Sequence, residues 1–505
     1  MNRKKGVILS YLMMIFEVLS TLLITPFLIR TLGQAEYGVY KLSASITAYL
    51  LLLDLGIGNA IIRYIAKYRA NCDRDAEQKF LGIAILFYIA VAVLSVICGI
   101  VLLFLFPTVF SKGLSAEEIA LGQKLLLITI INVAVTIGTT VYSNVIIAYE
   151  KFGVSKGFSI LQIILRMIMT VAVLKAGMGS IGVVSVNLIL TVLCRGVFVI
   201  YVFARLKLRP KFKGVDKRLV GEVFGYSIWI LLQMIATQIN VSMDQILLGS
   251  LVVASSTIIA VYSVGTQIVQ YFRSIGSSFT GVLMPGVVRF AERGATGEAI
   301  CGEMVRIGRI MLIVLGLIWA GFTALGRQFI ALWAGSANAS AYTVALLLMS
   351  VYLFVMVESI GVQILWAKNE QTEMSLLKLG IVLANVLVSV LLIRWNPLIG
   401  ATVGTVISLF LGDVVVMNIL FKKKLRISLR SYYKGLFKGV LLCILLSMGI
   451  GMAVNLLPLV GWFGLLIKIG LVCAIYGIML LLFGFNPYEK QLLLSLLRIK
   501  KANHG

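Results

Sequence analysis

Histidine is almost absent from this chain of 505 residues, and its single example, His504, is the penultimate residue. Imidazole is the commonest metal ligand in proteins and the usual acid–base group near neutral pH. Catalytic zinc sites need three protein ligands that converge in space. We therefore expect no metal site and no histidine acid–base chemistry.

Cysteine is also scarce, with six residues in the chain and no metal-binding spacing among them, so no disulfide is expected. No lysine is followed by serine or threonine, which excludes the phosphate-binding motif GxxxxGK[ST]. The chain is therefore expected to use no cofactor and not to hydrolyse ATP itself.

Hydrophobic residues make up 60% of the sequence, charged residues only 13%, and the mean hydropathy is +1.03. A soluble core cannot hide so much apolar surface, whereas runs of about 20 apolar residues match the hydrocarbon layer of a membrane. The sequence predicts an all-α integral membrane protein. Its fourteen predicted spans lie at residues 8–29, 42–62, 80–106, 121–148, 157–175, 180–204, 222–247, 251–283, 307–333, 341–367, 374–393, 398–421, 434–456 and 460–485.

Basic residues lie at alternate ends of these spans. When basic residues toward the ends of a span are counted with the adjoining gap, 34 of the 45 Lys and Arg residues fall in the odd-numbered gaps, counting the N-terminal segment first, and 7 fall in the even-numbered gaps. Because cytoplasmic loops collect basic residues, both termini are predicted to be cytoplasmic. The net charge of +25 therefore lies beside the membrane, where it contacts anionic lipids, and nucleic acid is not an expected partner.

Acidic residues are too sparse outside the spans to form a catalytic site. The longest predicted outer gap, 107–120, is short and contains only Glu117 and Glu118 as acids. No paired carboxylates or activated nucleophile can be recognised there. A membrane enzyme such as a glycan polymerase or ligase is therefore excluded, and a transporter is predicted.

A weak internal repeat divides the chain. Glu17 and Thr21 align with Gln233 and Thr237 at an offset of 216, and Arg195 aligns with Asp413 at an offset of 218. Six spans in each half predict a parallel repeat, whose two lobes rock about a site near the middle of the membrane. Because both lobes belong to one polypeptide, a monomer is predicted. The predicted parts are an N-lobe at 1–210, a basic linker at 211–221, a C-lobe at 222–430, two further spans at 431–485 and a cytoplasmic amphipathic tail at 486–505.

Residues 30–68, RTLGQAEYGVYKLSASITAYLLLLDLGIGNAIIRYIAKY, carry a motif of known type. The pair Leu32-Gly33, the loop from Glu36 to Tyr40 and the segment from Leu53 to Arg63 resemble the opening signature of the bacterial polysaccharide flippases. These form the Wzx-type branch of the multidrug/oligosaccharidyl-lipid/polysaccharide exporter superfamily.

The resemblance implies a flippase of the bacterial inner membrane. It would move an undecaprenyl-diphosphate-linked oligosaccharide from the cytoplasmic to the outer leaflet by alternating access, for surface polysaccharide synthesis. The glycan polymerase machinery is then a candidate partner. In the related lipid II flippases the two extra spans form a groove for the polyprenyl tail, and spans thirteen and fourteen are expected to do the same here. A lipid II flippase and a cation-coupled multidrug exporter of the same superfamily are the alternatives.

Charged side chains inside spans need a reason, because each costs at least ~2.5–3.5 kcal/mol at the centre of a bilayer. Arginine stays charged and makes forked bonds to phosphate oxygens, which suits a diphosphate head group. The alternative is that each arginine pairs with a carboxylate and holds helices together. The candidate diphosphate-binding residues are Arg273, Arg166, Arg195, Arg63 and Arg289.

Other polar residues have candidate roles in coupling and sugar binding. Arg195 and Asp413, at equivalent positions of the repeat, are a candidate gate pair, and Glu17 and Asp54 are candidates for coupling to H⁺ or Na⁺. Transport driven by the membrane potential, worth ~2.3 kcal/mol per charge per 100 mV, is the open alternative to such coupling. The candidate sugar contacts are Glu358, Gln363 and Gln233.

Overall fold

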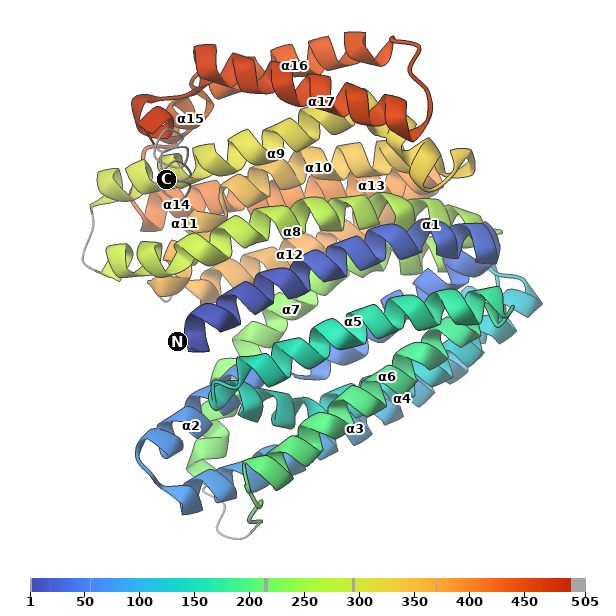
Figure 1. Ribbon diagram of the computed structural model, residues 1–505, viewed down its shortest axis with the longest axis vertical. Coiled ribbons are helices and arrows are strands. Elements are labelled where there is room, and N and C mark those ends of the chain that lie inside the picture. Colours follow the sequence, from blue (N-terminus) through green and yellow to red (C-terminus); the bar gives the residue numbers. More distant parts are fainter. Residues whose placement is uncertain (1, 55, 213–216, 293–295, 369, 492–505) are drawn as a thin grey trace, which may run out of the picture. The chain divides into compact units, whose positions relative to one another are not determined.

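The computed structural model describes residues 2–54, 56–212, 217–292, 296–368 and 370–491, and within them the side chains of 2–8, 11, 59, 217–230, 233, 279–292, 371 and 372 are not described. All regular elements in these ranges are helices, which confirms the predicted all-α class (Figure 1). Nine helices there are long and apolar enough to cross a membrane, or eleven if each of two bent pairs counts as one span.

The chain forms two compact units, and the first comprises residues 1–263 with the short segment 393–401. Its helices are α1 (Asn2–Leu50), α2 (Gly58–Ala70), α3 (Arg74–Phe110), α4 (Ala116–Ala148), α5 (Phe152–Lys175), α6 (Gly179–Ile200) and α7 (Lys217–Leu251), with short turns η1 (Leu51–Asp54) and η2 (Tyr201–Arg205). Helix α1 packs against α4, α5, α6 and α7, and α4 packs against α3 and α6.

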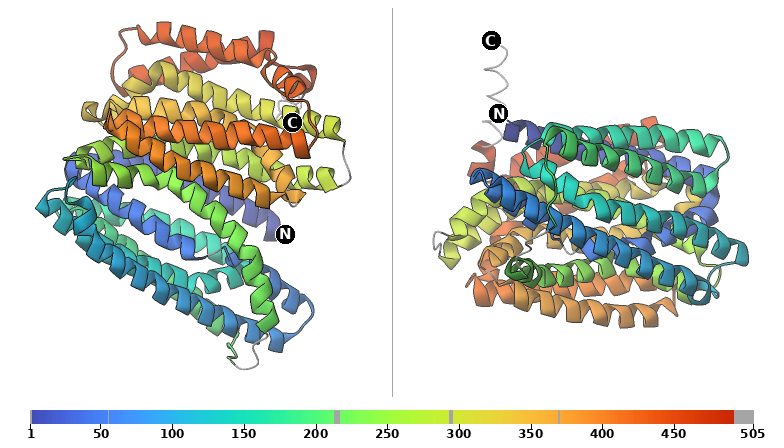
Figure 2. Two further views of the ribbon diagram at one scale, coloured as in Figure 1. Left: turned by 180° about the vertical axis from the view of Figure 1, so that it is seen from behind. Right: turned by 90° about the horizontal axis from the view of Figure 1, so that it is seen from below.

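The second unit comprises residues 264–392 and 402–505. Helix α9 lies beside α10, α15, α16 and α17 in this unit (Figures 1 and 2). Its helices are α8 (Ser256–Glu292, whose first turns belong to the first unit), α9 (Gly297–Trp333), α10 (Ala341–Val357), α11 (Ser359–Ala367), α12 (Gln371–Ile393), α13 (Pro397–Leu409), α14 (Val416–Lys424), α15 (Leu429–Phe437), α16 (Val440–Asn455) and α17 (Gly461–Met479), with short turns η3 (Ser336–Asn338), η4 (Phe410–Val415) and η5 (Leu480–Gly484).

Breaks in the helices fall where the sequence permits them. Predicted spans one and two share α1, which is interrupted at Gly33, where φ is 76°. Glycine adopts this left-handed backbone at little steric cost. The predicted tenth span is α10 and α11, bent by 43°, and the thirteenth is α15 and α16, bent by 45°.

Large apolar side chains remain exposed on the outer faces of the helices. Phe104 on α3 is 76% exposed, and Phe463 on α17 is 78% exposed. Such surface is unstable against water, whereas acyl chains solvate it. The exposed apolar faces therefore agree with the membrane prediction made from composition.

Polar groups connect the helix ends at which α3 begins and α4 finishes. The Tyr149 hydroxyl donates to Glu77 Oε1 at 2.6 Å, and Arg74 Nη1 donates to the Tyr149 hydroxyl at 3.2 Å. Burial raises the pKa of Tyr149 above its ordinary value, and the Glu77 carboxylate raises it further. Tyr149 therefore stays protonated and remains a donor to Glu77.

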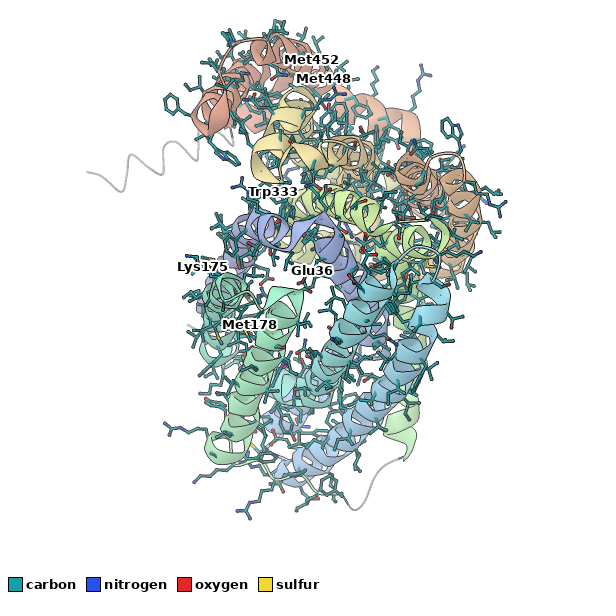
Figure 3. The ribbon with its side chains drawn as sticks, turned by 90° about the vertical axis from the view of Figure 1, so that its right-hand side faces the viewer. Glu36, Lys175, Met178, Trp333, Met448 and Met452 are labelled. Atoms are coloured by element: carbon teal, nitrogen blue, oxygen red, sulfur yellow. The ribbon has the colours of Figure 1, made fainter. Side chains whose placement is uncertain are left out.

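The motif from Glu36 to Gly38 has a structural role in the first unit. Glu36 Oε1 accepts a hydrogen bond from the backbone N–H of Ser180 at 2.6 Å, at the start of α6 near Met178 (Figure 3). An acid at a helix N-terminus is stabilised by the unpaired N–H groups there. Tyr37 is completely buried, and Gly38 lies so close to Ser256 that a Cβ would come within 1.8 Å of its carbonyl oxygen.

A second close contact joins the α3–α4 connection to the α7–α8 connection. A Cβ on Gly113, between α3 and α4, would come within 1.9 Å of the Gly249 carbonyl oxygen, and the Ser255 N–H donates to the Gly113 carbonyl at 2.8 Å. The Ser45 hydroxyl on α1 donates to Gln245 on α7. The second half of α1, the α3–α4 connection and the α7–α8 connection thus form one tight junction, called here the α1–α7 junction.

Candidate functional site

Arg273 on α8 is a predicted site residue for which the described side chains provide no acidic partner. Among the side chains that the structure describes, its guanidinium meets only Gln270 Oε1, at 3.4 Å from Nη1, and the ring of Tyr352 on α10, 4.7 Å from the centroid. Its Nε is buried without a hydrogen-bond partner. Guanidinium offers five donors, so four are unused among the described side chains, and the buried Nε is one of them.

Arg166 on α5 has an acidic partner instead. Its Nη2 lies 2.7 Å from Glu17 Oε1 on α1, so two predicted site residues are brought together. The two side chains are 33% and 49% exposed, respectively. This pair joins α5 to α1. It matches the alternative stated for the intramembrane arginines, which is pairing with a carboxylate that holds helices together. A role of Arg166 in diphosphate binding and of Glu17 in ion coupling both stay predictions.

Arg195 on α6 also lies among residues of its own unit. It interacts electrostatically with Asp54, which in turn interacts with Tyr88 on α3. Asp413, in the second unit, forms an ion pair with Lys378 on α12. Each member of the predicted gate pair thus has a partner within its own unit, and the gate stays a prediction.

The remaining predicted residues differ in their surroundings. Arg63 on α2 is exposed, and the side chains of Arg289 and Gln233 lie outside the described residues. Gln363 on α11 is partly buried, and its Oε1 has no partner. Glu358, between α10 and α11, is only 1% exposed.

A polar cavity of about 230 Å³ lies between α1, α4 and α6 in the first unit. Ser43 Oγ and Asn132 Oδ1 in its wall are buried without a hydrogen-bond partner. Tyr40 belongs to the same wall and interacts electrostatically with Arg166. The polar lining residues are Tyr40, Ser43, Thr47, Thr129, Asn132, Thr136 and Asn187.

This wall is not among the predicted site residues, although the sequence contains a signal for it. Its residues on α1 and on α4 recur at the same steps, three and then four residues apart, which places each set on one helix face. Hydroxyl and amide groups in a cavity match the hydrogen-bonding groups of a sugar. The cavity is thus a candidate sugar site.

An apolar cavity of about 300 Å³ lies in the second unit between α9 and α17. Its lining residues are Leu317, Ile318, Gly321, Phe322, Leu325, Gly326, Phe329, Leu465, Ile469, Val472 and Cys473. A wall of this chemistry suits a hydrocarbon chain, because it offers dispersion contacts and almost no hydrogen bonds.

Arg309 on α9, for which the sequence predicted no role in a site, is only 4% exposed. Its Nε and Nη2 donate to the Glu489 carboxylate at 2.7 and 3.0 Å, and Nη2 also donates to the Gly484 carbonyl at 2.8 Å. Nη1 donates to the carbonyls of Lys438 and Gly435 at 2.7 and 3.0 Å. All five guanidinium donors are used.

These bonds attach the last two spans to α9. Gly435 and Lys438 lie at the end of α15, just before the bend to α16, whereas Gly484 and Glu489 follow α17. Arg309 therefore joins both ends of the predicted extra pair at one point, called here the Arg309 clamp.

The chain has relatives in sequence and in fold. A family model described as "Polysaccharide biosynthesis protein" matches residues 4–291, whereas no curated protein sequence matches. Lipid II flippase MurJ, in an inward closed conformation, is similar with a TM-score of 0.71 and 15% identity, over 94% of this chain and 97% of that one.

Two other solved structures share the architecture. An inward-facing multidrug resistance MATE family transporter has a TM-score of 0.61 and 13% identity, over 80% of this chain and 96% of that one. A transporter of the same superfamily from Pyrococcus furiosus, described by the reversed polarity of its binding pocket, has a TM-score of 0.59 and 14% identity, over 84% and 96%. At these identities the likeness concerns the fold.

Proposed function

Because the chain belongs to the polysaccharide biosynthesis protein family, we propose that it flips an undecaprenyl-diphosphate-linked oligosaccharide from the cytoplasmic to the outer leaflet. The family and the fold confirm the predicted relationship to the multidrug/oligosaccharidyl-lipid/polysaccharide exporter superfamily, and the chain is a membrane transporter rather than an enzyme.

Arg273 is the observation that carries this proposal. A guanidinium within a span, without a carboxylate among the described side chains, is costly unless an anion compensates it. The two phosphates of a diphosphate head group supply that charge and accept forked hydrogen bonds. A transporter of organic cations has no use for such a group, which argues against the multidrug alternative.

Two cavities, each within a single unit, have linings that suit other parts of the proposed substrate. The polar cavity between α1, α4 and α6 would contact sugar hydroxyls, and the apolar cavity between α9 and α17 would hold part of the polyprenyl tail. The predicted lobes at 1–210 and 222–430 would rock in alternating access, in a monomer of the bacterial inner membrane with both termini in the cytoplasm.

Ligand-induced stabilisation of the purified protein tests the substrate class. Undecaprenyl diphosphate should raise the unfolding temperature at concentrations where uncharged undecaprenol does not, because a ligand at 100 times its Kd adds about 2.7 kcal/mol. Larger stabilisation by lipid II than by an oligosaccharide-linked lipid would favour the lipid II alternative. Stabilisation by organic cations but not by the diphosphate would overturn the proposal.

In the predicted topology the α1–α7 junction lies at the outer end of the spans. There it would close the transport pathway toward the outer side of the membrane. Gly38→Ala would place a methyl group within 1.8 Å of a backbone oxygen and should disfavour closure by about 1–3 kcal/mol, a shift of roughly 5- to 150-fold in population. A cysteine pair at Ser45 and Gln245 should cross-link readily in the parent chain and much less with Gly38→Ala.

Gly157→Ala on α5 is the matched control, because nothing lies within 4 Å of a Cβ added there. It should leave cross-linking unchanged. Equal cross-linking in the Gly38 variant would show that the junction does not open, or that its closure does not depend on this contact.

A further inference from the structure

Glu358 occupies an unusual place in the second unit. It joins α10 to α11, where the helix axis bends by 43°, and the side chain is only 1% exposed. Helices α11 and α14 pack against each other beside it (Figure 1). A carboxyl group is thus enclosed at the bend of a broken span.

The hydrogen-bond partners of this carboxyl group are neutral. Oε1 accepts from the Tyr433 hydroxyl at 2.6 Å and from Asn418 Nδ2 at 3.0 Å, and Oε2 accepts from the same Nδ2 at 3.2 Å. The titratable groups that act on it are Asp413 on η4 and Tyr432 and Tyr433 on α15. Within the described part of the chain, no basic side chain faces it.

Three other described carboxylates of the helices are compensated by a cation. Glu17 pairs with Arg166, Asp413 with Lys378, and the buried Glu489 with Arg309. An enclosed carboxylate with only neutral donors keeps most of its desolvation cost, and Asp413 adds a second negative charge nearby. Taking up one proton removes the charge and that cost together.

We propose that Glu358 is a proton-binding site through which transport is coupled to the proton gradient. The proposal rests on the proposed function for its coupling role, although not for proton binding itself. A proton from hydronium adds to a carboxylate oxygen: an O–H bond of the hydronium breaks, an O–H bond to the carboxyl oxygen forms, and the products are the neutral acid and water. Tyr433, which is only partly buried, connects Oε1 to the less enclosed side of α15.

A proton fits this site better than a metal ion does. The Asn418 amide nitrogen and the Tyr433 hydroxyl donate to the carboxylate, and Asn418 Oδ1 adds a single buried oxygen without a hydrogen-bond partner. A Na⁺ ion needs several oxygen lone pairs directed at it. The described residues also contain no cluster of three acidic, histidine or cysteine side chains that could hold a metal.

Protonation would change the contacts between three helices. The ionised carboxylate is a strong acceptor for Tyr433 on α15 and Asn418 on α14, and the neutral acid is a weaker one. Gain or loss of the proton therefore alters the bonds that hold the α10–α11 bend to these helices. A bend in a span is a mechanically suitable place for such coupling.

Infrared spectroscopy of the purified, full-length protein tests proton binding without any substrate. The wild type should show a protonated carboxyl band at about pH 6, where exposed glutamates are ionised. Glu358→Gln should lose this band, and Glu17→Gln, at the alternative coupling residue, should keep it. Tyr433→Phe should shift the pH at which the band appears.

A band that persists in Glu358→Gln, or is absent from the wild type, would overturn the proposal. If Glu358→Gln does not fold, the wild-type band and its shift in Tyr433→Phe decide whether Glu358 binds a proton.

In proteoliposomes, the lipid-linked oligosaccharide should drive proton movement in the wild type and not in Glu358→Gln. Coupling to a Na⁺ gradient instead would contradict the coupling role, whereas failure of the wild type to flip the lipid would reject the proposed function alone.

Discussion

Replacing Arg273 with alanine is expected to abolish export of the glycan while the protein still folds. The guanidinium makes only a long contact to Gln270 and a cation–π contact to Tyr352, so its loss leaves no buried acid without a partner. Each charge-assisted hydrogen bond to a phosphate is worth about 1.5–3 kcal/mol. Affinity for undecaprenyl diphosphate should fall by roughly 10- to 150-fold for one such bond and further for a fork.

Arg327→Ala is the matched control for this experiment. Arg327 on α9 also stacks on a tyrosine, Tyr342, at 5.2 Å, and has no proposed role in binding. Surface polysaccharide and diphosphate binding should be near normal in this variant and intermediate in Arg273→Lys, which keeps the charge but loses the fork. Unchanged surface polysaccharide in Arg273→Ala would contradict the role assigned to this residue.

Membrane spans can be predicted from local sequence, because each depends on the hydropathy of about 20 consecutive residues. The apolar runs therefore indicate the long apolar helices that the structure contains. The breaks within helices are harder to predict from the sequence. Gly33 interrupts α1 through its backbone angle, and the bend at Glu358 has no proline to indicate it. The structural roles of Glu36 and Gly38 could not be predicted from the motif either, because their partners lie in the distant helices α6 and α8.

Charge pairing could not be predicted because it joins distant parts of the chain. Arg166 and Glu17 are separated by 149 positions, and Arg309 and Glu489 by 180. From sequence, Arg309 is one of many basic residues in a predicted cytoplasmic gap, and Glu358 is a candidate sugar contact. Packing encloses Arg309 and Glu358, whereas Arg273 is only partly buried and differs from Arg166 and Arg309 in having no acidic partner among the described side chains.

Breaking the Arg309 clamp is expected to produce the largest loss of stability. Arg309→Met would leave the Glu489 carboxylate buried without its cation, at 5% exposure, and would free the carbonyls of Gly484 and Lys438. Removing one partner of a buried ion pair costs about 3–5 kcal/mol. The difference in the free energy of unfolding can be measured by titrating the purified protein, in mild detergent, with a denaturing surfactant.

Arg306→Met provides the control on the same helix, one turn away. Arg306 is 48% exposed, pairs with Glu303 at 3.1 Å and lies over the ring of Tyr488 at 4.3 Å from the centroid. An exposed ion pair contributes about 0–1 kcal/mol and an exposed cation–π contact about 0.5–1 kcal/mol, which is still well below the cost expected for Arg309→Met. Adding Glu489→Gln to Arg309→Met should recover part of the loss, because it removes the stranded charge but not the unmet carbonyls. Proteolysis should then cut first near α16 and α17, since the clamp attaches both ends of this pair to α9. Equal stability of the Arg306 and Arg309 variants would mean that the enclosed guanidinium contributes no more than a surface charge.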